Sequence, residues 1–165
     1  MTTRPVSIPE GYTTVTPWIV TKDTAALIDF IKEAFDAEEL SRVLVGDGVI
    51  GHAEARIGDA VVMMFDSPFP VDTPALLRLF VDDAEAVVLR AVQAGAVVVT
   101  EPTELFWGDK VGRVRDPLGN VWWIQQRLAD LTPEEIAVRA EDPAYAEAMT
   151  YLQSTLGPAL PADQA

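Results

Sequence analysis

The chain carries two copies of one local pattern, and this internal repeat constrains its fold more than any other feature. Each copy runs an apolar strand into an aspartate suited to cap an alanine-rich amphipathic helix. The copies are residues 19–27, IVTKDTAAL, and residues 79–87, LFVDDAEAV. Three further strand-like segments follow each helix. The repeat predicts an α+β fold in which two βαβββ modules lie side by side and share a cleft.

Composition indicates a folded protein with a substantial core. The chain has 165 residues, of which 49% are hydrophobic and 23% charged, which is typical of a globular domain. It has no cysteine, so disulfides, thiolate zinc sites and a thiol nucleophile are excluded. No apolar run approaches the roughly 18 residues that span a bilayer, and the polar first residues show no export signal. We therefore expect a cytoplasmic protein without a membrane partner.

The charge balance is strongly acidic and narrows the choice of partners. Formal net charge is −14, which argues against nucleic acid and anionic membranes, since both require basic patches. Much of the acidity lies after Leu128, where seven acids stand against the single base Arg139. Such charge usually serves solubility; the alternative is attraction of a cationic ligand.

Periodicity and turn signals predict the elements of each module. In the first module we expect a strand over Thr14–Val20, a helix from Asp23 to Asp36, and strands over Glu38–Val45, Ile50–Ile57 and Val61–Phe65. In the second we expect a strand over Leu76–Val81, a helix over Asp83–Ala94 closed by Gly95, a broken strand from Val97 to Trp107, and strands over Lys110–Arg115 and Val121–Gln125.

These elements predict one domain over residues 1–130, with modules at about 13–67 and 75–127. A proline-containing linker over residues 66–75 joins the modules. A helical extension over 131–157 follows, opened by a capping box from Thr132 to Glu135 and broken at Asp142-Pro143. Residues 158–165 are expected to be a disordered tail.

Several collinear motifs between Thr14 and Gln126 resemble one superfamily. They are KEAF at 32–35, GHAEARIGD at 51–59, WGD at 107–109 and DPLGNVWWI at 116–124. Together they resemble the glyoxalase/bleomycin-resistance/extradiol-dioxygenase superfamily, which has the vicinal oxygen chelate fold. The LTPEE segment at 131–135 resembles an uncharacterised bacterial branch. The fold hosts lyases, epimerases, oxygenases, thiol transferases and non-catalytic drug binders, so the resemblance implies architecture before activity.

The resemblance also implies where a metal would bind. Enzymes of this superfamily typically hold one divalent ion, a Lewis acid, through His and Glu side chains on the first and fourth strands of each module. The matching positions here are Thr16, Met63, Leu76 and Trp123. A hydroxyl, a thioether, an alkyl group and an indole do not make a ligand set for such an ion, and a register shift of one residue supplies nothing better. We therefore expect no metal and no other cofactor.

His52 and Glu54 are the candidate catalytic residues. Residues two apart on a strand point to the same side, so this pair shares one surface. We expect a hydrogen-bonded polar pair on the cleft wall. A proton-transfer pair, or a weak metal site completed by Asp109 or Glu101, stays open as an alternative.

Strand alternation predicts which side chains line the cleft. The candidate ligand-binding residues are Trp18, Met63, Phe65, Arg78, Trp107, Trp123 and Gln125. This aromatic surface with a few polar anchors is typical of a small-molecule pocket. Arg78 needs an anionic or carbonyl partner, which is either a ligand or Glu54. Arg113 and Arg115 are expected on an exposed or dimer-facing strand.

Three functions follow, in order of preference. The first is a metal-independent protein, monomer or homodimer, that binds a small organic ligand as bleomycin-resistance proteins sequester a cationic drug, an antibiotic-resistance-like role. The second is an enzyme: a lyase or isomerase using His52 and Glu54, or a metal-dependent dioxygenase. The third is a structural or regulatory module acting through the acidic C-terminal helices.

Overall fold

The computed structural model describes residues 8–69 and 74–156. The chain divides into two compact units, Met1–Val71 and Asp72–Ala165, and each is described by itself. Each unit holds a four-stranded mixed sheet and a helix, which confirms the two βαβββ modules and the α+β class. The shared cleft stays a prediction. The predicted disordered tail and residues 70–73 of the predicted linker lie outside the described residues.

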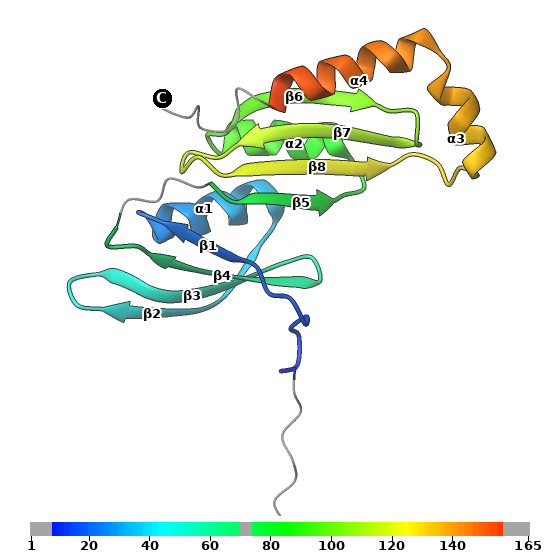
Figure 1. The fold of residues 1–165 in the computed structure, drawn as a ribbon. Coiled ribbons are helices and arrows are strands. Elements are labelled where there is room, and N and C mark those ends of the chain that lie inside the picture. Colours follow the sequence, from blue (N-terminus) through cyan, green and yellow to red (C-terminus); the bar gives the residue numbers. More distant parts are fainter. Residues whose placement is uncertain (1–7, 70–73, 157–165) are drawn as a thin grey trace, which may run out of the picture. The chain divides into compact units, whose positions relative to one another are not determined.

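The first unit is built as the repeat predicts. Its elements are β1 (Trp18–Thr21), α1 (Thr24–Phe35), β2 (Glu38–Val45), β3 (Val49–Ile57) and β4 (Ala60–Asp66). The sheet order is β1-β4-β3-β2, with β1 parallel to β4 and the other pairs antiparallel (Figure 1). The apolar stripe of α1 is fully buried at Leu27, Ile28 and Ile31, because helical spacing puts these residues on one face.

The first strand begins later than predicted, at Trp18 rather than Thr14. Local hydrogen bonds hold the preceding residues in a loop: the Thr13 hydroxyl donates to the Val15 carbonyl and the Thr16 hydroxyl to the Thr13 carbonyl. Pro17 has no N–H to give to a strand ladder. Threonine side chains that bond nearby backbone groups compete with sheet formation, which a β-branched composition does not reveal.

The second unit repeats this plan and adds two helices. Its elements are β5 (Leu76–Phe80), α2 (Ala84–Gln93), β6 (Val97–Glu104), β7 (Asp109–Arg115), β8 (Val121–Arg127), α3 (Pro133–Ala140) and α4 (Pro143–Leu156). The sheet order is β5-β8-β7-β6. Strand β6 runs unbroken through Pro102, with register shifts on either side of Thr100. An edge strand tolerates proline because one side of it needs no ladder bonds.

The helix starts show that the repeat extends to single hydrogen bonds. The side chains of Asp23 and Asp83 accept from the N–H groups of Ala26 and Ala86 at 2.9 and 3.0 Å. Both aspartates are therefore N-caps, as predicted.

A second repeated contact ties each helix to its sheet. The Thr24 N–H donates to Asp66 Oδ1 at 2.7 Å, and the Ala84 N–H donates to Gln126 Oε1 at 3.1 Å. Asp66 also accepts from the Ile50 N–H at 2.7 Å. In each unit a side chain at the end of the fourth strand thus satisfies an N–H that the first helical turn leaves unpaired.

The C-terminal extension forms two helices, as predicted. Thr132 and Glu135 make the capping box, and Pro133 occupies the first turn of α3. Within the described residues, no helix is long and apolar enough to span a membrane.

Helix α4 covers a sheet face that the sequence assigns to a ligand cleft. A side chain at Gly112 would meet Val88 of α2, so its neighbours Val111 and Arg113 point to the opposite face. There Val111 joins a buried cluster with Leu152 of α4, and α4 runs along β6 (Figure 1).

Arg113 is buried, contrary to the predicted exposed strand. Its side chain is 1% exposed. Arg113 Nη1 donates to the Leu152 carbonyl at 2.6 Å and to the Thr100 hydroxyl at 3.2 Å. Strand alternation places Arg113 and Arg115 on one face of the sheet, but it does not show that a later helix covers Arg113.

The hydrogen bond between helix and sheet can be tested in both units, because Asp66 accepts it with a charged carboxylate and Gln126 with a neutral amide. We expect Asp66→Ala to lower the free energy of unfolding by about 2 kcal/mol, because a partly buried carboxylate loses two charge-assisted hydrogen bonds, and Gln126→Ala by about 1 kcal/mol. Urea unfolding measures both.

The pH dependence separates the two variants. Burial opposes ionisation of Asp66, but hydrogen bonds from Ile50 and Thr24 outweigh it and lower the pKa of the carboxyl below 3.8. Its contribution is complete above pH 3.8 and lost as pH falls through the lower folded value. The difference in the free energy of unfolding between wild type and Asp66→Ala should therefore become smaller as the pH falls. The corresponding difference for Gln126→Ala should not change. Parallel pH curves would contradict this account.

Helix α4 is expected to stabilise the second unit. Leu152→Ala removes a side chain that is 4% exposed and should cost about 3 kcal/mol through lost burial and the cavity left behind. Gln153→Ala, at the neighbouring exposed position, should cost less than about 0.5 kcal/mol. Thermal or urea unfolding compares them; equal losses would show that α4 does not support the sheet.

Candidate functional site

A pocket lies between the N-terminal segment and the first sheet. It has a volume of about 660 Å³ and lies entirely within the first unit. Its lining residues are Ile8, Pro9, Tyr12, Thr13, Thr14, Thr16, Glu54 and Met63. The loop that replaces the first half of the predicted strand therefore forms one wall, and β3 and β4 form the other.

Three polar side chains meet at this wall. The Tyr12 hydroxyl donates to Glu54 Oε2 at 2.6 Å, and His52 Nε2 lies 2.9 Å from Glu54 Oε1. The His52 and Glu54 side chains are 31% and 17% exposed, so both are within reach of a ligand. This is the hydrogen-bonded pair expected from their spacing on one strand, with Tyr12 as a third member.

The hydrogen bonds fix the charge of Glu54. The Tyr12 hydroxyl and then His52 lower the pKa of the Glu54 carboxyl below its ordinary 4.5, although burial opposes this. The same contact raises the pKa of Tyr12 above 10.0, with burial adding to the effect. Glu54 is therefore an ionised acceptor at neutral pH, and Tyr12 keeps its proton.

Aromatic side chains adjoin the polar group. The Trp18 ring lies 5.6 Å from the His52 ring and 5.6 Å from the Phe65 ring, measured between centroids. Met63 is the register partner of both Trp18 and Glu54. The structure thus brings together the first-unit candidates on one sheet face, and Trp18 stays 50% exposed.

Tyr12 is the site residue that sequence reasoning missed. It lies in a segment with no strand or helix periodicity, and its partner Glu54 is 42 positions away. Gly11 brings this segment close to the sheet: its φ is +81°, and a Cβ there would lie 3.0 Å from Arg56 Nη2. Glycine before an aromatic residue is the one local signal that pointed here.

In the second unit, Trp123 lies between two arginines. Its register partners are Arg78 on β5 and Arg113 on β7. The guanidinium carbons lie 4.8 Å and 3.9 Å from the Trp123 ring centroid, which is cation–π distance. Burial and then the charge of Arg78 lower the pKa of Arg113 to about 10, so Arg113 remains charged at neutral pH.

Trp107 and Gln125 belong to the interior of the second unit. Trp107 Nε1 donates to Asp109 Oδ2 at 3.1 Å, and Gln125 Nε2 donates to the same oxygen. Gln125 is 5% exposed, and Trp107 packs against the cluster around Leu152. Trp107 therefore packs beside α4, whereas Gln125 joins β8 to β7 through Asp109.

The residues at the family's four metal positions do not fit a divalent ion. The Thr16 hydroxyl is bonded to a neighbouring carbonyl, Leu76 offers an alkyl group, and Met63 a thioether. Trp123 carries two guanidinium groups over its ring, and their positive charge repels a cation. Within residues 8–69 and 74–156, no group of three or more His, Asp or Glu side chains is placed to hold a metal.

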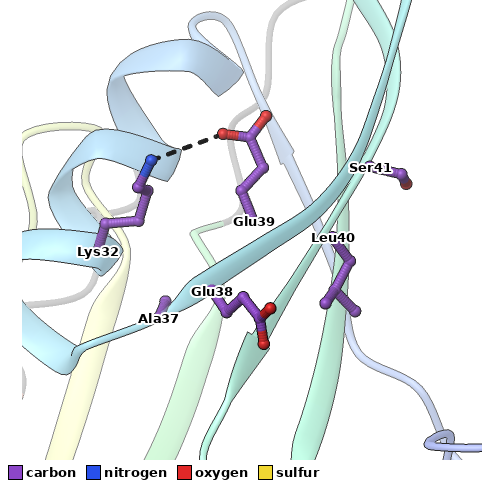
Figure 2. Close-up of a pocket in the computed structure, with 6 residues that line it drawn as sticks. All are labelled: Lys32, Ala37, Glu38, Glu39, Leu40 and Ser41. Carbon is purple, nitrogen blue, oxygen red and sulfur yellow. Dashed lines mark ion pairs between the residues drawn. The ribbon is translucent and has the colours of Figure 1, made fainter.

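A second, open groove of about 620 Å³ lies at the start of β2. Figure 2 shows its lining, with Lys32 reaching from α1 toward Glu39 on the strand. Glu39 pairs with Lys32 at 3.8 Å and with Arg42 at 2.8 Å. Lys32 and Glu39, two charged residues of this lining, are therefore already paired with each other.

Comparisons with known proteins agree with the motifs. The sequence profile described as "Glyoxalase/Bleomycin resistance protein/Dioxygenase superfamily" matches residues 12–124. An uncharacterized protein of Mycobacterium bovis is 39% identical over 134 residues, covering 74% of this chain and 88% of that protein. An uncharacterized protein of Mycobacterium tuberculosis is equally similar, with 79% of its length covered.

Solved structures share the fold at lower identity. TioX from Micromonospora sp. ML1 aligns with a TM-score of 0.58 and 23% identity, covering 73% of this chain and 100% of TioX. The fosfomycin resistance protein FosX from Mesorhizobium loti aligns with a TM-score of 0.54 and 16% identity, covering 76% and 97%. At these identities the likeness shows the fold alone, and it confirms the predicted vicinal oxygen chelate architecture.

The Tyr12 contact makes a direct prediction for Glu54. We expect Tyr12→Phe to raise the pKa of Glu54 toward 4.5, as followed by NMR titration of the carboxyl carbon. Because the folded pKa is depressed, the stability that Tyr12 adds is present above pH 4.5 and lost as pH falls through the folded value. Tyr145→Phe removes another bonded hydroxyl and serves as control. An unchanged Glu54 titration in Tyr12→Phe would refute the coupling.

Proposed function

This chain belongs to the Glyoxalase/Bleomycin resistance protein/Dioxygenase superfamily, and we propose that it acts there as a metal-independent binder of a small organic molecule. The ligand lies in the pocket between the N-terminal segment and the first sheet. The observation that carries this proposal is the Tyr12–Glu54–His52 hydrogen-bond group. Tyr12 and Glu54 line the pocket together with Met63, and Trp18 lies beside His52.

The size and lining of the pocket support a drug-sized ligand. A volume of about 660 Å³ lies within the range of about 300–1,000 Å³ typical of ligand sites. Trp18 offers a half-exposed ring for stacking, and Met63 adapts its shape to an apolar body. These side chains supply affinity, while the polar group orients the ligand.

The charge of Glu54 supports a ligand with a cationic or strong donor group. Its carboxylate is ionised at neutral pH, and it carries no arginine or lysine partner among the described residues. The net charge of −14 adds a long-range attraction for cations. Sequestration of such a molecule unchanged is a resistance function.

A charge series of one aromatic probe tests this function. We expect 1-naphthylmethylammonium to bind more tightly than 1-naphthylmethanol by calorimetry. Its affinity should fall at least tenfold in Glu54→Gln, because the ion pair is lost, and in Trp18→Ala, because the stacking surface is lost. Treatment of the protein with EDTA should leave the affinity for 1-naphthylmethylammonium unchanged.

Glu39→Gln is the matched control, because it removes the same charge from the same sheet at a residue that salt-bridges Lys32 and Arg42. Equal losses of affinity in Glu54→Gln and Glu39→Gln would show that only the net charge matters, and would overturn the proposed site. Binding that EDTA abolishes and one added metal ion restores would overturn metal independence.

Proton transfer by His52 is the second candidate, favoured by the same geometry. An ionised carboxylate 2.9 Å from one imidazole nitrogen orients the ring and sets its tautomer, which is the arrangement that proton transfer requires. NMR in D₂O tests this candidate. Exchange of deuterium into carbon-bound positions of the probe, or chemical conversion of the probe, would make the protein an enzyme if it is lost in His52→Gln. Recovery of an unexchanged, unchanged probe supports the binder.

A further inference from the structure

We propose that the second unit binds a small organic carboxylate, with Arg78 as the charged contact and the apolar side chains beside it as the seat for the ligand's body. The proposal stands on residues of the second unit alone. It therefore goes beyond the pocket of the first unit and does not depend on it.

Arg78 carries a charge that the protein leaves uncompensated. Its side chain is exposed, and within the described residues it has neither a hydrogen bond nor an ion pair; its contact is the face of Trp123. Other arginines of this acidic chain differ. Arg127 pairs with Asp130 at 2.6 Å and Arg139 with Glu104 at 2.5 Å.

A second positive charge stands behind the first. Arg113 contacts the same Trp123 ring at 3.9 Å and is bonded to the Leu152 carbonyl and the Thr100 hydroxyl. No carboxylate neutralises it among the residues that the structure describes. Two like charges on one indole repel each other, and an anion beside Arg78 would relieve that repulsion.

The unsatisfied polar atoms around Trp123 are donors. Trp123 Nε1 and Arg113 Nε are buried and have no hydrogen-bond partner. The buried acceptor atoms of this unit that lack a hydrogen bond, on Asp109 and Gln125, belong to the next pairs of the strand ladder, toward Arg127, whose Nε lies 3.8 Å from Asp109 Oδ1. What is missing beside Trp123 is therefore negative charge or an acceptor oxygen.

The residues that flank Arg78 indicate the body of the ligand. Leu76 and Phe80 are two positions away on either side, so they share its sheet face, and they are 51% and 64% exposed. One strand therefore presents a cationic side chain between two apolar ones, an arrangement that complements an amphipathic acid. An arginine on a carboxylate also forms a bidentate pair that fixes orientation.

The closing experiment uses the full chain and the opposite members of the probe series. We expect 1-naphthoate to bind, and 1-naphthylmethanol to bind at least tenfold more weakly. Naphthoate affinity should fall at least tenfold in Arg78→Gln and change less than twofold in Arg127→Gln, which removes another exposed charge from the same sheet. The Trp123 indole N–H resonance, assigned through Trp123→Phe, should shift on naphthoate addition.

Each arm has an outcome that overturns the proposal. Equal losses in Arg78→Gln and Arg127→Gln would show non-specific charge attraction, and equal affinity for acid and alcohol would show apolar adsorption alone. Glu54→Gln should leave naphthoate binding intact, so failure at Arg78 and failure of the first-unit pocket are separate results. Because Arg78 is exposed, we expect Arg78→Gln to keep the thermal midpoint of the wild type. An unchanged midpoint excludes misfolding as the cause of lost binding.

Discussion

In each half of this protein, one hydrogen bond joins the start of the helix to the end of the fourth strand of the sheet. The first helical N–H donates to a side chain at the end of the fourth strand, Asp66 in one unit and Gln126 in the other. In the first unit the same carboxylate also holds the start of β3. The helix lies over one face of each sheet, and the opposite faces of the two sheets differ in their side chains and in what covers them.

The sheet faces opposite α1 and α2 differ in the segment that covers them and in the charge of their side chains. In the first unit a loop lies over the sheet and leaves a pocket around Glu54. In the second unit α4 lies over the sheet, and Arg113 is buried beneath it. Glu54 pairs in register with Met63, and Arg113 pairs with Trp123, so the duplicated plan holds opposite charges at corresponding places. The same order of strands and helix therefore presents a carboxylate in one unit and guanidinium groups in the other.

The residues at the family's metal positions are not suited to binding a metal ion. Where a divalent ion needs carboxylate or imidazole donors, this chain places an alkyl group, a thioether and an indole flanked by guanidinium groups. Side chains of these kinds are suited to stacking on and enclosing organic molecules. They agree with the proposed binding of an organic ligand, and the His52–Glu54 pair is an arrangement that also suits proton transfer.

The sequence by itself determined the two modules, the aspartate caps, the C-terminal helix break and the alternation that sets His52 and Glu54 side by side. All of these depend on neighbours within a few residues, where period and capping chemistry act directly. Only the tertiary structure decided that Tyr12 bonds Glu54 across 42 positions and that Arg113 is buried under α4 across 39. Such contacts follow from how an irregular loop and a late helix pack on a finished sheet, and no local period encodes that packing.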